Sequence, residues 1–156
     1  MGARALERRC VIDRREILEA ASSLSLLPSI VEKDYVLGWI LAGINAHSEI
    51  SGSWVFKGGT CLKKCYFETY RFSEDFDFTL LDESHIDENF LRSAFEEVAG
   101  WVSEQSGLDV AAEQLEFDIY RNPRGRLNCQ GKIAYRGPAS PASGGWPKVK
   151  LDLDGR

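Results

Sequence analysis

The amino-acid sequence predicts an α/β (α+β) domain in which a mixed β-sheet packs against helices. Two observations point to this class. Apolar residues recur at helical spacing in the N-terminal third and over 87–107, whereas several short segments bounded by Gly, Pro and Ser alternate with a period of two. With 156 residues, the chain has the length of one domain with one substantial core. We therefore expect residues 1–156 to form a single unit, with its first helices within 14–47.

Helical periodicity predicts two helices near the N-terminus. The first runs from about Arg14 to Leu26, and the second begins at Pro28 or Ser29 and ends near His47. A third long helix is predicted over 87–107, because this segment opens with acidic residues and closes on a glycine, the usual start and stop signals.

Short strands are predicted in the remaining segments. The first, SGSWVF, is followed by a paired-glycine turn and then by a helix over 60–70. The others are separated by turns rich in Gly, Pro and Ser and are DFDFTLL (75–81), LEFDIYRN (115–122), LNCQGKIAYRG (127–137) and PKVKLDLD (147–154). Helices and strands in this order predict a layered sheet-and-helix structure.

Charge and composition narrow the functional classes. The formal net charge of −5 gives no general electrostatic reason to bind nucleic acid, so a polyanion would need a local basic patch. Arg121–Arg126 (RNPRGR) is the best such patch, although a solvated turn is an equally good interpretation of it. The two histidines argue against a multi-histidine metal cage and against Ser/His/Asp or Cys/His catalysis.

The N-terminal segment carries scattered arginines and lacks the uninterrupted apolar run of a signal peptide or a membrane span. The sequence therefore predicts a cytoplasmic protein with no membrane partner. The cysteines form no CxxC pair, and in that compartment we expect them to be reduced thiols rather than a disulfide framework; they are Cys10, Cys61, Cys65 and Cys129.

Acidic residues are spaced for metal binding on two predicted strands. Asp75 and Asp77 project from the same strand face, roughly 7 Å apart at their Cα atoms, while the phenylalanines between and after them point to the core. Such a pair can hold a hard divalent cation, for which Mg²⁺ is best suited. The strand over 147–154 repeats the pattern and offers a third carboxylate, with Asp152 the first candidate and Asp154 the second.

The paired glycines supply a complement to the acids. Gly58 and Gly59 lack Cβ atoms and let the backbone approach a phosphate, and the amides and hydroxyl at Thr60 would donate to it. Lys57, Lys63 or Arg71 would neutralise further charge. Taken singly, the glycine pair is also explained as a structural turn and the acids as a solvated strand face.

At this point the chain resembles a known family. The segment FKGGTCLKKCY followed by RFSEDFDF is similar to the signature of the AbiEii/AbiGii toxin family of nucleotidyltransferase-like proteins, whose pattern is close to KGGTxLxK, a short gap and RxSxDxDF. Upstream, VEKDYVLGWIL resembles the family's N-terminal EKD-tyrosine helix, and downstream KVKLDLD resembles its lysine-containing third-carboxylate strand. These landmarks keep their order from Ile30 to Asp154.

The resemblance implies a role for each matching residue. Gly58, Gly59 and Thr60 would form the nucleotide-phosphate loop, with Ser73 beside the metal site. Asp75 and Asp77 would be the Mg²⁺ ligands, and Lys150 and Asp152 would be the later lysine, which contacts triphosphate, and the third acid, which helps to deprotonate the acceptor. The role of Lys57 stays open: it would either contact phosphate or support the end of its strand. Glu32, Lys33 and Asp34 are expected to organise the helix layer against the sheet.

The resemblance also implies a minimal nucleotidyltransferase fold, similar to polymerase β-like enzymes, and transfer of NMP from an NTP to an acceptor hydroxyl with Mg²⁺ or Mn²⁺. The expected acceptor is RNA, such as the 3′ end of tRNA, in a toxin–antitoxin or phage-defence system with an antitoxin encoded nearby. Family members continue with a helical C-terminal domain, which we expect this sequence to lack. Two alternatives remain open: a degenerate NTP-binding module without catalysis, and a DxD metal-dependent nucleotide-sugar transferase.

Overall fold

The computed structural model describes residues 12–58 and 75–156. Within these ranges three helices, six strands and two single 3₁₀ turns follow one another along the chain. The helices are α1 (Arg14–Leu24), α2 (Pro28–Ala46) and α4 (Glu88–Ser106). The strands are β1 (Trp54–Lys57), β2 (Asp75–Leu80), β3 (Asp109–Val110), β4 (Glu116–Arg121), β5 (Leu127–Arg136) and β6 (Lys148–Gly155), and the turns are η2 (Glu83–His85) and η3 (Ala112–Gln114).

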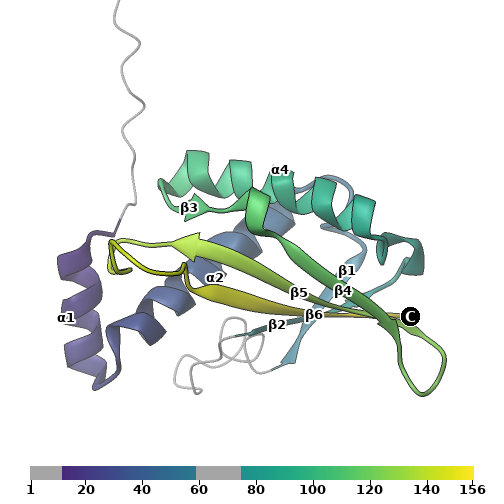
Figure 1. Cartoon of the computed structure of the whole chain (residues 1–156), viewed down its shortest axis with the longest axis horizontal. Helices are drawn as coiled ribbons and strands as arrows, with labels where there is room; N and C mark the ends of the chain where they lie inside the picture. The colour runs from purple at the N-terminus through teal and green to yellow at the C-terminus, as the bar shows by residue number, and fades with distance from the viewer. Residues whose placement is uncertain (1–11, 59–74) are drawn as a thin grey trace, which may run out of the picture.

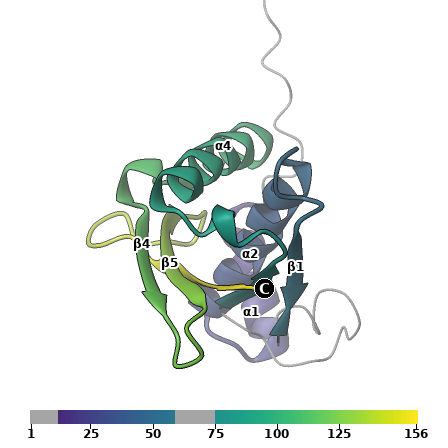
Figure 2. The same ribbon diagram turned by 90° about the vertical axis from the view of Figure 1, so that its right-hand side faces the viewer.

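The strands form one mixed sheet in the order β1-β2-β6-β5-β3, and β4 also pairs with β5. All pairs are antiparallel except β2 and β6, which run parallel. Helices α2 and α4 pack against each other and cover one face of the sheet, while α1 packs on α2 at the far end of the molecule (Figures 1 and 2). The predicted fold class, a mixed sheet packed against helices, is confirmed.

The helix ends follow from local capping. The Asp13 side chain accepts a hydrogen bond from the Glu16 amide at the start of α1, and Asp87 accepts one from the Phe90 amide at the start of α4. Helix α4 ends at Gly107 with φ of 74°, as the sequence predicts. Helix α1 ends two residues before the predicted position, because Ser25 adopts the left-handed conformation with φ of 56°.

The strands agree closely with their predicted segments, with two exceptions. Strand β1 begins only at Trp54, after a turn that occupies the first residues of the predicted segment. Strand β3 was not predicted, because two residues are too few to show an alternation. The helix predicted over 60–70 lies outside the described residues.

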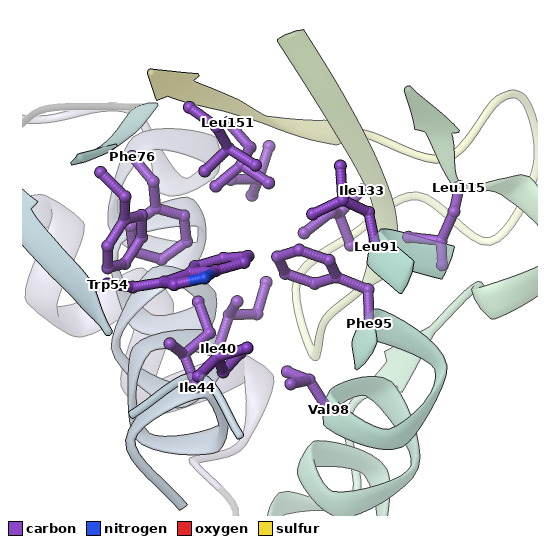
Figure 3. Packing of buried hydrophobic residues seen from close by; sticks show 14 of the residues in the cluster. Ile40, Ile44, Trp54, Phe76, Leu91, Phe95, Val98, Leu115, Ile133 and Leu151 are labelled. Atoms are coloured by element: carbon purple, nitrogen blue, oxygen red, sulfur yellow. The ribbon is translucent and has the colours of Figure 1, made fainter. Parts of the chain in front are cut away.

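The core lies between the sheet and the pair of helices. Phe76, Phe78 and Leu80 of β2 are buried, as are the alternate residues of β6, and both sets point toward α2 and α4. Trp54 and Phe95 meet at the centre of this cluster with ring centroids 5.8 Å apart, and Ile40 and Ile44 of α2 lie beside them (Figure 3). The residues that alternate with these on β2 and β6 therefore face away from the helices.

Glu32 of α2 is buried, with 3% of its surface exposed, and it binds the connection between β5 and β6. Its carboxylate accepts hydrogen bonds from the Ala139 amide, at 2.5 Å, and from the Ser140 hydroxyl. A Cβ atom on Gly137 would lie 2.6 Å from Glu32 Cδ, so only glycine fits there. This contact agrees with the expectation that Glu32 organises the helix layer against the sheet.

Cys129 is the free cysteine of the described ranges, and burial raises the pKa of its thiol to about 12. It is therefore a packing residue that stays protonated at neutral pH. The other three cysteines lie outside the described residues. In the described ranges, no helix has both the length and the apolar character needed to cross a bilayer.

Candidate active site

The face of the sheet opposite α2 and α4, here called the polar face, carries three rows of side chains that run across neighbouring strands. The strand registers define each row. The acid row lies in the middle and contains Lys57, Asp77, Asp152, Gln130 and Asp118. The lysine row, one step toward the start of β2, contains Asp75, Lys150, Lys132 and Glu116. The tyrosine row, one step toward the end of β2, contains Thr79, Asp154, Asn128 and Tyr120.

The parallel pairing of β2 with β6 sets the carboxylates of Asp77 and Asp152 side by side. Burial raises the pKa of Asp77 above its ordinary value of 3.8, and repulsion from Asp152 raises it further. Lys57 lowers the pKa, but not enough to cancel these effects. Burial and repulsion from Asp152 thus both act against the charged form of the Asp77 carboxylate, a condition that a bound cation would relieve.

Asp154 lies one step further along β6 in a different environment. Its carboxylate accepts hydrogen bonds from Lys57 Nζ and from Thr79 Oγ1, both at 2.7 Å. Burial alone would raise the pKa of Asp154, but the hydrogen bonds and the lysine charge outweigh it and hold the pKa below its ordinary value. Asp154 thus joins β1, β2 and β6 and is already satisfied by protein groups.

Gly58 follows β1 and lies against the acid row. It adopts a left-handed conformation with φ of 83°, and a Cβ atom there would lie 3.1 Å from Asp77 Cγ and closer still to Asp77 Oδ2. Glycine is required for both reasons, because other residues disfavour this φ and would collide with the carboxylate. The start of the glycine turn is thereby held beside Asp77.

Two cavities open on either side of the acid row and share Asp152. The lysine-side cavity, of about 330 Å³, is lined by Asp75, Asp152, Gln130, Lys132 and Lys150. Lys132 and Lys150 are direct cross-strand partners and both are exposed, so the cavity offers two adjacent ammonium groups beside the carboxylates of Asp75 and Asp152. These ammonium groups are the part of the lysine-side cavity that suits an anion.

The tyrosine-side cavity, of about 210 Å³, lies toward the β4–β5 hairpin. Its lining includes the carboxylates of Asp77 and Asp152 together with Asn128 and Tyr120. Tyr120 is 39% exposed. This cavity offers an aromatic surface and hydrogen-bonding groups next to the same two acids.

The structure therefore brings together most of the predicted site residues. Asp75, Asp77, Lys150 and Asp152 lie in adjacent rows of the polar face. Lys57 binds Asp154, which favours the strand-end support that the sequence left open. Gly59, Thr60 and Ser73 lie outside the described residues, as do Lys63 and Arg71.

Several residues at the site were not found from the sequence. Asn128, Gln130 and Lys132 share one parity on β5, so the alternation of that strand could have placed them on one face. What the sequence did not reveal is that β5 neighbours β6. Without that neighbour relation, the three side chains could not be assigned to the acids on β6.

The donor set suits a hard divalent cation, since carboxylate oxygens are the preferred ligands of Mg²⁺. The repulsion between Asp77 and Asp152 supports this fit. In the described ranges, however, no three His, Cys, Asp or Glu side chains converge closely enough to form a complete metal site as they stand. Asp77 and Asp152 are the side chains that would hold such a cation.

Comparisons with known proteins identify the chain at the level of the family. A comparison with curated proteins finds no match. The family model for the nucleotidyl transferase AbiEii toxin of type IV toxin–antitoxin systems matches residues 39–156, a range that includes the strands and helix α4 and all three rows of the polar face. The match covers well over half of the sequence, and the chain belongs to the AbiEii nucleotidyltransferase toxin family.

Proposed function

We propose that this chain is a divalent-metal-dependent nucleotidyltransferase toxin that transfers NMP from an NTP to a hydroxyl of RNA, with the 3′ end of tRNA as the first acceptor to test. Family membership supports the reaction class and the toxin role. The observation that carries the proposal is the parallel register of β2 and β6, which places Asp77 beside Asp152, where the two carboxylates repel each other.

Asp77 and Asp152, with Asp75 beside them in the next row, would hold Mg²⁺ or Mn²⁺. When bound, the cation would supply charge neutralisation at the phosphates and activation of the attacking hydroxyl. Lys150 and Lys132 would balance the remaining charge of the triphosphate in the lysine-side cavity. Gly58 would let the turn after β1 approach the phosphates closely.

The transfer itself makes one bond and breaks one. The acceptor hydroxyl oxygen attacks the α-phosphorus and forms a new phosphodiester bond, while the bond from the α-phosphorus to the bridging oxygen breaks and pyrophosphate leaves. The proton of the acceptor hydroxyl passes to a carboxylate oxygen of Asp152. Asp152 suits this role because it lines both cavities and so lies between the two substrates.

In the toxin–antitoxin setting, the proposed activity would arrest growth by blocking the RNA that it modifies, and would serve in defence against phage. A cognate antitoxin encoded next to the toxin would oppose it. The family description names a toxin of a type IV toxin–antitoxin system, which supports the toxin–antitoxin part of this setting.

The test is transfer of label from α-³²P NTPs, each supplied separately, to total tRNA with Mg²⁺ or Mn²⁺. We expect labelling that is lost with a chelator and falls at least about 100-fold in Asp77→Asn and Asp152→Asn, as loss of charge stabilisation at a reaction centre predicts. Asp109→Asn is the matched control, because Asp109 is an exposed strand aspartate on β3.

Four outcomes would contradict the proposal. Label that persists without divalent metal would exclude the carboxylate role, and equal loss in Asp109→Asn would show an effect on folding alone. Metal-dependent NTP binding, measured by calorimetry, without transfer to RNA or protein would favour the non-catalytic binding module. Better binding of UDP-sugars than of NTPs would favour the nucleotide-sugar transferase.

A further inference from the structure

We propose that the β4–β5 hairpin together with the tyrosine-side cavity forms the acceptor-RNA subsite. The inference rests on the proposed function and adds which surface receives the RNA. Its elements are an aromatic residue at the cavity, Tyr120, and the basic turn that joins β4 to β5, Arg121–Arg126.

The two cavities beside the acid row differ in charge, and this difference assigns the substrates. The lysine-side cavity has two adjacent ammonium groups, Lys132 and Lys150, which favour the triphosphate as the more highly charged group. Lys57 in the tyrosine-side cavity is already paired with Asp154 at 2.7 Å. The tyrosine-side cavity is thus left for a group that brings less charge, such as a terminal nucleoside with its free hydroxyl.

The turn of the hairpin is built to present positive charge. Asn122 Oδ1 accepts hydrogen bonds from the amides of Arg124, at 2.9 Å, and Arg126, at 3.0 Å. The Arg121 guanidinium donates to the carbonyl of Gly125 at 2.8 Å. These contacts fix the backbone of the turn, while the side chains of Arg124 and Arg126 are exposed to solvent. The segment 121–126 has three arginines and no acid, although the whole chain has a net charge of −5.

The basic turn and the cavity are physically connected. Asn122 Nδ2 donates a hydrogen bond to Asn128 Oδ1 at 3.2 Å, and Asn128 lines the tyrosine-side cavity. Tyr120, an exposed residue, lies opposite Asn128 in the β4–β5 register and lines the same cavity. A strand whose phosphates contact the arginines would therefore have its terminal base within reach of the ring, and aromatic rings stack on bases of any sequence.

The hairpin turn lies at the opposite end of the molecule from α1 and projects beyond the sheet (Figure 1). In Figure 2 the hairpin turn lies on the side of the sheet away from α4, which is the side of the polar face. An RNA end that reaches the hairpin turn from this side would not meet α4. This placement favours nucleic acid with a free 3′ end over a buried small-molecule acceptor.

The test separates RNA binding from nucleotide binding and from transfer. The probe is a 5′-fluorescent single-stranded RNA with a free 3′ hydroxyl, and the variants are Arg124→Gln/Arg126→Gln, Tyr120→Ala and Tyr120→Phe in the full chain. The control is Arg14→Gln/Arg15→Gln, which removes the same charge from exposed positions on α1. NTP binding is followed in parallel by calorimetry.

We expect the hairpin double variant to weaken RNA binding about 10-fold and to reduce the slope of log K against log salt by about 1.4, since each lost phosphate contact on a single strand contributes about 0.7. Tyr120→Ala should weaken RNA binding about 5- to 100-fold, as loss of a base stack predicts, and Tyr120→Phe should restore it. The NTP affinity of the hairpin variants and the RNA affinity of the α1 control should equal those of the wild type.

Other outcomes overturn the inference. RNA affinity and salt slope equal to wild type in the hairpin variants would exclude the hairpin, even if transfer to RNA proceeds and the proposed function stands. Wild-type chain that binds no RNA, or transfer of label to a protein instead, would exclude an RNA subsite. Hairpin-dependent RNA binding without any transfer would overturn the proposed catalysis and leave the hairpin as an RNA-binding surface.

Discussion

Asp77 and Asp154 occupy adjacent rows of the same polar face, yet their surroundings have opposite effects. Asp77 lies among other acids, and burial and repulsion raise its pKa. Asp154 receives hydrogen bonds from Lys57 and Thr79, and its pKa is lowered. The comparison separates two environments of a strand carboxylate: burial and repulsion act against the charge on Asp77, whereas the bonds of Asp154 hold three strands together.

The largest effect on stability is expected from Gly58→Ala, which adds a Cβ atom against Asp77. The strained φ of 83° and the collision together should lower the free energy of unfolding by about 2–4 kcal/mol, measured by urea denaturation. Gly125→Ala is the control, because Gly125 has a similar φ of 78° with no atom near the position of the Cβ. Its loss should be only about 1 kcal/mol. Equal losses of stability in the two variants would show that the Asp77 side chain moves away from the new methyl group without destabilising the fold.

Removing the partner of Asp154 should have a smaller effect. Lys57→Met is expected to lower the free energy of unfolding by about 1 kcal/mol, because both members of the pair are partly exposed and the pair is screened by solvent. Lys148→Met serves for comparison, since its pair with Glu116 is similarly exposed but joins no third strand. A greater loss in the Lys148 variant would refute the bridging role of Asp154.

Neutralising Asp77 should instead stabilise the protein. Asp77→Asn removes a carboxylate that repels Asp152, and we expect the free energy of unfolding at pH 7 to rise by up to about 1 kcal/mol, after allowance for solvent screening of this partly exposed group. Asp109→Asn should change stability by less than about 0.5 kcal/mol. Thermal or urea unfolding measures both, and destabilisation by Asp77→Asn would show that the comparison with Asp154 is mistaken.

The smallest expected effect is on the pH dependence of the free energy of unfolding. The pKa of Asp77 is higher in the folded chain than in the unfolded one, so its destabilising effect appears as pH rises from about 3.8 through the folded pKa. The gain from Asp77→Asn should therefore vanish below about pH 3.8. The pKa of Asp154 is lowered, so its stabilising effect is complete above 3.8 and is lost as pH falls further. This assignment would be contradicted if the changes in the free energy of unfolding caused by Asp77→Asn and by Lys57→Met varied with pH in the same direction.

Much of the fold could be predicted because its signals are local. Alternation on 75–81 and 147–154 placed the acids on one strand face and the aromatic or aliphatic residues on the other, as the burial of β2 and β6 confirms. The acidic N-cap and terminal glycine of α4 likewise marked its ends. The structure also sets Asp152 opposite Asp77, where the third carboxylate was expected.

What could not be predicted depends on contacts between distant segments. Asp154 was ranked as an alternative to Asp152, but its bonds to Lys57 and Thr79 involve strands whose order the sequence does not reveal. The same holds for Lys132, which reaches the site only because β5 pairs with β6. The roles of the candidate residues in catalysis and metal binding stay predictions.

The parallel pairing of β2 with β6 also has a consequence for biosynthesis. Thr79 and Asp154 contact each other across 75 residues of sequence, and Asp77 and Asp152 are in the same register. Contacts of such long range form late in folding, and a chain on the ribosome lengthens by only about 5–20 residues per second. The carboxylate pair therefore cannot assemble until β6 has left the ribosome, well after β2 has been made.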